Sequence, residues 1–209
     1  MGDVKERLTL RDERAAVTRR RIADAARALF GSRGYGATTL QAVADEAGVA
    51  VQTVYAVYGS KAGILHELRD TVVRQPAAEA LYEEALREVN AERKIELFAS
   101  SIRRRWEFGH DVVTIHSDAA ATDSSVRAEV EQVLGMRRNG IARLARSLEA
   151  ELRPGIDLAH ATAVLDALTL PEVYAELTDI GGWSADDFEA WLAECLKNQL
   201  LADRCQTRP

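Results

Sequence analysis

The sequence predicts an all-α protein in which a small helical head precedes a larger helical body. Alanine, leucine, glutamate and arginine are frequent and favour helices, whereas the 209 residues include only four prolines. No run of alternating β-branched residues is long enough to indicate a strand. Glycine, proline and short polar stretches divide the chain into successive helices.

The composition is that of a globular protein without a membrane segment. Apolar residues make up 47% and charged residues 29% of the chain. No apolar stretch approaches the ~20 residues of a membrane span, and the N-terminus lacks the apolar core of a signal peptide. The two cysteines, Cys195 and Cys205, form neither a disulfide framework nor a metal motif. We therefore expect a cytoplasmic protein that uses no metal and no cofactor.

Charge is divided unevenly along the chain. Residues 1–65 carry a net charge of +3 and residues 66–209 carry −9, which together give −6. Such an asymmetry indicates that the two parts have different partners. A mildly basic head can approach the phosphates of a nucleic acid, while an acidic body limits non-specific binding.

A first helix is expected before residue 34. Residues 1–17 are charged and weakly patterned, which fits an arm or a frayed helix start. The three arginines at 19–21 fit either a solvated helix start or a contact with nucleic-acid phosphates or the minor groove. Across residues 22–30 apolar side chains return at i, i+3, i+4 and i+7, which predicts a buried face. Gly34-Tyr35-Gly36 then ends the helix.

The next stretch predicts two short helices joined by a tight turn. Thr38 or Thr39 is a suitable N-cap, and Thr38 with Gln41 matches a capping box. Gly48 ends this helix, because glycine adopts a positive φ at little cost, and a second helix follows over 51–58. Helix, glycine turn and short helix form the helix-turn-helix plan, in which the second helix enters the major groove of DNA. An ordinary helical hairpin is the alternative.

Side chains at the start of the second helix favour the helix-turn-helix. Gln52 and Thr53 lie on its first turn, where contacts with base edges are made. Tyr55 can reach a phosphate, and Lys61 follows at the start of the next helix.

The run from Ile22 to Leu65 resembles the N-terminal DNA-binding domain of the TetR family of transcription repressors. The matching motifs, in the family's order and spacing, are F-x-x-x-G-Y at 30–35, A-x-x-A-G-V at 44–49, T-V-Y at 53–55 and Y-x-S-K at 58–61. The resemblance implies an N-terminal three-helix helix-turn-helix head that binds DNA. The residues expected to do so are Thr39, Val51, Gln52, Thr53, Tyr55 and Lys61.

From residue 61 onward the sequence reads as a series of helices. Their expected ranges are 61–75, 77–89, 91–108, 110–121, 125–152, 157–168, 171–179 and 184–203. We expect a helix-turn-helix DNA-binding domain over 1–65. The resemblance implies that 66–209 form a ligand-binding and dimerisation domain, and that the helix beginning at Lys61 links the two.

Aromatic and histidine side chains are concentrated in the first half of the body. Members of the resembled family bind a small molecule inside this bundle, and such a pocket needs apolar walls with a few polar groups. The expected lining residues are Trp106, His110, His116 and Tyr174. Each aromatic residue can instead belong to the core, and each histidine can lie at the surface.

The last helix carries a wide apolar stripe. In the resembled family the last two long helices pair with those of a second chain. The expected dimer interface therefore includes Phe188, Trp191, Leu192, Cys195 and Leu196. Packing of the stripe on the chain's own body is the alternative, and both can hold.

With the resemblance, these features predict a homodimeric, ligand-responsive repressor that leaves a palindromic operator in double-stranded DNA when a small-molecule effector binds its body. We do not expect an enzyme, since His66, His110-Asp111 and Asp166 copy only the residue order of helical metal-dependent phosphohydrolases. The alternative is a helical small-molecule-binding or enzymatic protein that has kept the fold without specific DNA binding. Ala50 and Val57, where the family often has serine and histidine or tyrosine, support that alternative.

Overall fold

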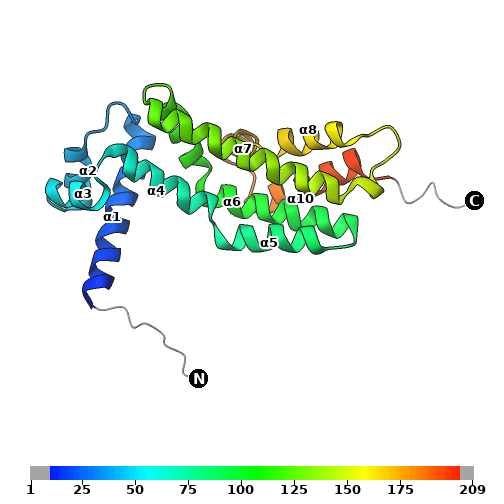
Figure 1. Ribbon diagram of the computed structural model, residues 1–209, viewed down its shortest axis with the longest axis horizontal. Helices are drawn as coiled ribbons and strands as arrows, with labels where there is room; N and C mark the ends of the chain where they lie inside the picture. Colours follow the sequence, from blue (N-terminus) through cyan, green and yellow to red (C-terminus); the bar gives the residue numbers. More distant parts are fainter. Residues whose placement is uncertain (1–9, 203–209) are drawn as a thin grey trace, which may run out of the picture. The chain divides into compact units, whose positions relative to one another are not determined.

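The computed structural model describes residues 10–202, and these residues form helices joined by short turns (Figure 1). Within 10–202 no strand is present, although one isolated antiparallel bridge joins Leu152 and Leu201. The all-α prediction is confirmed. The helices belong to two compact units. The head unit comprises the described residues up to Asp70 together with Thr114–Arg127, and the body unit comprises Thr71–Val113 together with the described residues from Ala128 onward.

The head unit is built on a helix-turn-helix. Its helices are α1 (Leu10–Arg33), α2 (Leu40–Ala47), α3 (Val51–Tyr58) and most of α4 (Lys61–Val73). The predicted buried face of α1 is confirmed, because Ile22 and Ala26 are fully buried and Leu29 and Phe30 nearly so. The turn after α2 is also as predicted, since Gly48 has a φ of 63° and its N–H is bonded to carbonyls of the last turn.

Of the two threonines predicted as possible N-caps of α2, only one has this role. Thr39 is the N-cap, and its hydroxyl accepts the N–H of Ala42 at 3.1 Å. Thr38 makes no capping box with Gln41. Its buried hydroxyl donates instead to the carbonyls of Leu29 and Gly34 near the end of α1. A side chain that is buried against a preceding helix cannot also turn back to cap the next one.

The last turns of α6 and the first turn of α7 complete the head unit. Ile115, Ala119 and Val126 from this segment are buried. The hydroxyl of Tyr35, in the turn between α1 and α2, donates to the Asp123 carboxylate at 3.2 Å. The compact head unit is therefore discontinuous in sequence, whereas the prediction for the DNA-binding domain is the single stretch 1–65.

The body unit contains the remaining helices and most of the large core side chains. Its elements are α5 (Pro76–Arg87), α6 (Ala91–Ala120), α7 (Ser124–Ser147), a 3-10 turn (Glu149–Glu151), α8 (Leu158–Leu168), α9 (Pro171–Ala175), a π-helical turn (Glu176–Ile180) and α10 (Ala185–Leu200), with the ends of α6 and α7 named above in the head unit. Phe98, Leu144, Leu165 and Phe188 are among its fully buried side chains. Ser184 caps α10 with a full capping box to Asp187.

A kink in α6 replaces the predicted break between two helices. Gly109 has non-helical φ and ψ of −164° and 34° inside a helix that otherwise continues. A Cβ at this position would lie 2.2 Å from Cγ2 of Val72, so glycine allows the end of α4 to approach α6 closely. Beside it, the Arg105 guanidinium donates to the carbonyls of Val72 and Val73 at 3.2 and 2.7 Å. These bonds satisfy carbonyls at the end of α4 that have no partner within the helix.

Candidate nucleic-acid interface and effector region

The outer face of α3 presents side chains that can reach a DNA groove. Gln52 is exposed, and Tyr55 is 55% exposed although it is a large aromatic residue. Val51 and Thr53 are half-buried on the first turn. Val54 is the only buried residue of α3 and anchors the helix to the head unit. The first turn therefore offers an amide, a hydroxyl and an apolar side chain, which are groups that read base edges.

Two further residues that are predicted to contact DNA lie outside α3. Their side chains differ in how far they are engaged within the chain. Thr39 is exposed at the N-terminus of α2. Lys61 is half-buried, and its ammonium donates to the carbonyls of Tyr35 and Thr38 at 2.6 and 3.1 Å. The same ammonium lies 4.2 Å from the centre of the Tyr35 ring, at cation–π distance. Lys61 thus holds the turn between α1 and α2, and a phosphate contact by Lys61 remains a prediction.

All three arginines at 19–21 are exposed, but two of them bind partners within the chain. Arg21 donates to the carbonyl of Ala47 at 2.6 Å, at the end of α2 and beside Gly48. Arg19 pairs with Glu67 on α4. The side chain of Arg20 is 85% exposed. Glu67 and Ala47, the partners of Arg19 and Arg21, are distant in the chain, so residue spacing does not reveal them.

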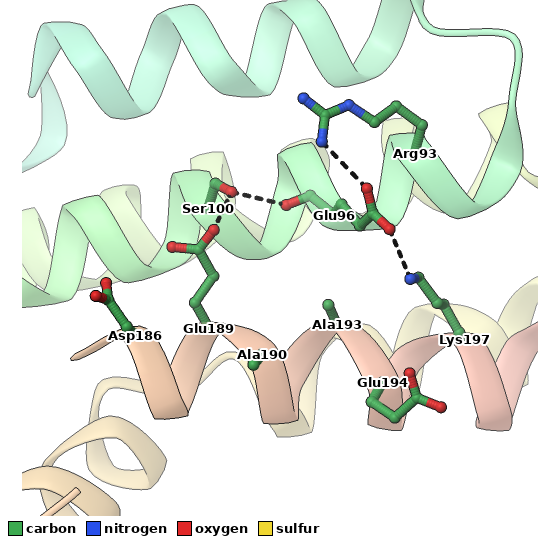
Figure 2. Close-up of a pocket in the computed structure, with 9 residues that line it drawn as sticks. All are labelled: Arg93, Glu96, Ser100, Asp186, Glu189, Ala190, Ala193, Glu194 and Lys197. Atoms are coloured by element: carbon green, nitrogen blue, oxygen red, sulfur yellow. Dashed lines mark hydrogen bonds and ion pairs between the residues drawn. The ribbon is translucent and has the colours of Figure 1, made fainter. Parts of the chain in front are cut away.

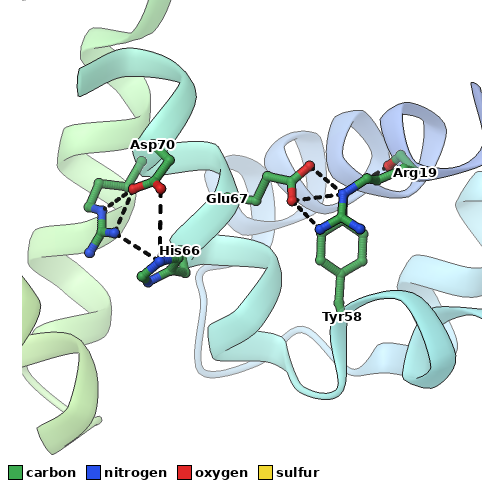
Figure 3. Close-up of polar contacts among 6 residues, drawn as sticks. Arg19, Tyr58, His66, Glu67 and Asp70 are labelled. Atoms are coloured by element: carbon green, nitrogen blue, oxygen red, sulfur yellow. Dashed lines mark hydrogen bonds and ion pairs between the residues drawn. The ribbon is translucent and has the colours of Figure 1, made fainter. Parts of the chain in front are cut away.

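Arg19, Tyr58 and Glu67 form a polar network, the α3-end network, that joins α1, α3 and α4 (Figure 3). Hydrogen bonds from Arg19 hold the pKa of Glu67 below its ordinary value. Burial, with the nearby Glu67 charge, raises the pKa of the Tyr58 hydroxyl well above its ordinary value. Glu67 is therefore ionised and Tyr58 is protonated at neutral pH, which is the state that these bonds require.

Three of the four predicted effector-binding residues lie together in the body unit. The Trp106 indole is buried and donates to the Thr169 carbonyl at 3.0 Å. Nδ1 of His110 lies 2.8 Å from the Trp106 carbonyl, and the His110 ring centre lies 5.1 Å from that of Tyr174. Nε2 of His110 is 2.9 Å from the carboxylate of Asp179, within the π-helical turn. Both ring nitrogens of His110 therefore lie within hydrogen-bond distance of an oxygen atom of the body unit.

The fourth residue, His116, lies elsewhere. It is buried and belongs to the head unit, whereas Trp106, His110 and Tyr174 belong to the body unit. The kink at Gly109 and the passage of α6 from one unit into the other are not readable from residue spacing. The structure therefore does not gather all four predicted residues in one unit.

The apolar stripe of α10 is mostly used inside the chain. Phe188, Leu192 and Leu196 are fully buried in a single chain. Phe188 packs edge-on against Tyr174, with ring centres 4.9 Å apart. Trp191 and Cys195 are half-buried. The alternative of packing on the chain's own body thus describes the first three residues, and a dimer contact through α10 remains a prediction.

A groove of about 470 Å³ lies between α6 and α10 of the body unit (Figure 2). Polar and charged side chains provide most of its lining, and Ala190 and Ala193 are its apolar members. Glu96 receives hydrogen bonds from Arg93 and Lys197 at 3.1 and 2.7 Å. None of the predicted effector-binding residues lines this groove. It lacks the apolar walls expected of the predicted effector pocket.

Two residues on which the enzymatic alternative depends, His110 and Asp166, are each bonded to another side chain. His110 is bonded to Asp179, and Asp166 pairs with Arg137, while His66 lies in the head unit. Among residues 10–202 no group of three or more histidines, cysteines and carboxylates could hold a metal ion. In the same part of the chain no helix combines the length and apolarity needed to span a membrane.

Comparisons with known proteins identify the head. Residues 22–68 match the family model of bacterial regulatory proteins of the tetR family. A comparison with curated proteins finds no match. Among solved structures, NalD of Pseudomonas aeruginosa, the secondary repressor of the MexAB-OprM multidrug efflux pump, is 23% identical with a TM-score of 0.69, covering 91% of this chain and 99% of NalD.

Two further solved structures have the same fold. PfmR, a TetR family transcriptional regulator from Thermus thermophilus, is 19% identical with a TM-score of 0.66, over 94% of this chain and 98% of PfmR. FadR from Bacillus subtilis, a transcriptional regulator in complex with stearoyl-CoA, is 18% identical with a TM-score of 0.66, over 85% of this chain and 96% of FadR. The fold is therefore shared along nearly the whole chain, and the helix-turn-helix at residues 22–68 matches that of bacterial regulatory proteins of the tetR family.

Proposed function

We propose that this protein is a homodimeric transcription repressor that binds a palindromic operator in double-stranded DNA and releases it when a small-molecule effector binds the body. The observation that carries the proposal is the exposed Gln52 on the first turn of α3, which follows a turn closed by Gly48. The site of action would be the cytoplasm, where the DNA is. No catalytic step is part of this function.

DNA would be read from the major groove by α3. The Gln52 amide suits a bidentate contact with adenine, while Thr53 and Val51 offer a hydroxyl and an apolar contact for the neighbouring bases. Thr39 and Tyr55 would contact phosphates on either side and fix the register. Two heads in a homodimer would enter successive major grooves about 34 Å apart, which is why a palindromic site is expected.

Effector binding would act on a two-state equilibrium. A ligand that prefers a body conformation unable to place both heads on DNA must lower operator affinity, and the operator must lower ligand affinity by the same factor. The stearoyl-CoA complex of FadR supports the idea that this fold can hold a small molecule. In this chain we place the site near Trp106, His110 and Tyr174, because a π-helical turn lies against them and such turns are frequent at functional sites.

Binding of a random duplex library to the purified full-length protein tests the DNA-binding proposal. We expect an enriched palindromic duplex, and the same half-site upstream of the protein's own gene. Failure to enrich any sequence, with the protein folded, would favour the alternative of a small-molecule-binding or enzymatic protein that has kept the fold.

A screen of small apolar molecules against the protein–duplex complex tests the effector proposal. A true effector raises the melting temperature of the free protein by mass action and releases the selected duplex. His110→Ala should weaken both responses while leaving ligand-free DNA binding close to that of the wild type. An unchanged response in His110→Ala would place the effector site elsewhere in the body.

A further inference from the structure

The C-terminal end of α3 is tied to two other helices of the head unit. Tyr58, the last residue of α3, donates its hydroxyl hydrogen to the Arg19 carbonyl at 3.0 Å, and the Glu67 carboxylate lies at 3.4 Å from the same oxygen. The Arg19 Nε lies 2.8 Å from each oxygen of Glu67. The Arg19 guanidinium also lies 4.8 Å from the centre of the Tyr58 ring. As Figure 3 shows, these side chains converge from α1, α3 and α4.

Core packing alone attaches α3 weakly. The helix has eight residues, and Val54 is its only buried one. Val51, Thr53 and Val57 are only half-buried, so the packing of α3 is shallow and leaves its angle weakly restrained. Tyr58 stands one turn beyond Val54, and its bonds supply a second point of attachment.

We propose that Arg19, Tyr58 and Glu67 are positioning residues that hold α3 at the angle where Gln52 and Thr53 meet base edges. They raise the preference for the operator over other DNA without touching DNA themselves. The inference rests on the proposed function, since it presupposes that α3 reads DNA. Its physical basis is the strict geometry of base-edge hydrogen bonds, which a small tilt of α3 would break, whereas contacts with phosphates tolerate such a change.

A simpler role for Arg19 makes the opposite prediction. If Arg19 were a phosphate contact, Glu67 would compete with DNA for its guanidinium. Glu67→Gln would then free a cation, remove a negative charge and strengthen binding to all DNA. If Glu67 positions α3, the same substitution weakens binding to the operator. The two roles therefore differ in the sign of the effect.

The test uses the full-length protein with two probes, a duplex selected by the wild type from a random library and a scrambled duplex of equal length and composition. Binding is followed by fluorescence anisotropy. For Glu67→Gln and for Tyr58→Phe we expect roughly a tenfold loss on the selected duplex, the scale at which members of one network are coupled. Affinity for the scrambled duplex should stay unchanged or rise. The double variant should lose little more than either single variant, because both substitutions break the same network.

Two variants serve as matched controls. Glu46→Gln removes an exposed carboxylate from α2 and reports the effect of charge alone. Tyr82→Phe removes a hydroxyl that donates to the Gly140 carbonyl at 2.9 Å in the body unit, and it reports the effect of losing one tyrosine hydrogen bond on stability. Melting temperatures of all variants are measured beside the binding constants. The positioning role requires that Tyr58→Phe lose selectivity and that Tyr82→Phe keep it.

Two results would overturn the inference. One is equal loss on the selected and scrambled duplexes, which would indicate general destabilisation of the head. The other is binding by Glu67→Gln as tight as that of Glu46→Gln on both probes, which would leave the α3-end network with no part in DNA reading. Failure of the wild type to select any duplex would instead contradict the proposed function on which the inference rests.

Discussion

Individual basic side chains determine how much positive charge the head unit can offer to DNA. Arg19, Arg21 and Lys61 all bind partners inside the head unit, whereas the side chain of Arg20 is 85% exposed. Three of the ten lysines and arginines among residues 1–65 are thus held by partners within the chain. Neutral side chains such as Gln52 would carry much of the discrimination between sequences, because contacts with phosphates carry no sequence information.

Gln52→Ala should relax the preference for one base position of the operator. Loss of a bidentate base contact costs about 1–3 kcal/mol of discrimination. The measurement is binding to a set of selected duplexes in which each position is changed in turn. Gln41→Ala, which removes an exposed glutamine from α2, is the control. Equal losses for Gln52→Ala on every duplex, scrambled ones included, would contradict a base-reading role.

The Arg19–Glu67 pair predicts a pH dependence of stability. The folded-state pKa of Glu67 is lowered from its ordinary value of 4.5, so the pair stabilises the fold above that value and loses this contribution as pH falls through the folded-state pKa. Urea unfolding of the wild type and of Glu67→Gln should therefore differ at neutral pH and converge in acid. The Glu67 side chain is 31% exposed, so the difference will be modest. If the difference in unfolding free energy between the two proteins instead grows in acid, the predicted direction of the pH dependence is wrong.

At the scale of elements, the close approach of α4 to α6 depends on one glycine. Gly109→Ala would place a Cβ 2.2 Å from Cγ2 of Val72. Overpacking of this kind costs about 1–3 kcal/mol in unfolding free energy. Gly135→Ala in α7 is the matched control, because a Cβ there meets nothing within 4 Å and alanine in a helix stabilises by about 0.5–1 kcal/mol. If urea unfolding shows that Gly109→Ala is more stable than Gly135→Ala, the close approach of α4 is not the reason for glycine at position 109.

The two sides of α10 should respond differently to charge. Leu196 is fully buried in the chain, so Leu196→Glu should prevent folding whatever the oligomeric state. Cys195 is half-buried, and Cys195→Glu should leave a folded protein that sediments as a monomer if α10 forms the dimer contact. Gln199→Glu adds the same charge at an exposed position and should remain a dimer. A dimeric, folded Cys195→Glu protein would place the interface elsewhere.

At the scale of the whole molecule, the chain does not divide into a head and a body at a single point. It passes from one compact unit to the other within α4, α6 and α7. The turn that joins α6 to α7 contributes Asp123 to the head unit, where it accepts a hydrogen bond from Tyr35. Two of the helices that build the body unit thus also complete the core of the head unit. An N-terminal fragment alone would lack part of that core.

The sequence by itself determined those features whose causes are local. Gly48 ends α2 because only a residue that accepts a positive φ can do so there. Ser184 begins α10 because its hydroxyl caps the N–H three residues ahead. The buried face of α1 follows from the spacing of its apolar residues. The exposed position of Gln52 on the first turn of α3 follows from the same periodicity.

Only the tertiary structure decided which distant residues meet. Glu67 pairs with Arg19 across 48 positions of sequence, and His116 lies in a different compact unit from His110 although only five residues lie between them. Tertiary packing also determined that Thr39 rather than Thr38 caps α2, because the Thr38 side chain is buried against α1 and bonded there. Helix caps and periodicity arise from interactions within a few residues, whereas ion pairs and burial depend on how helices pack, which residue spacing does not encode.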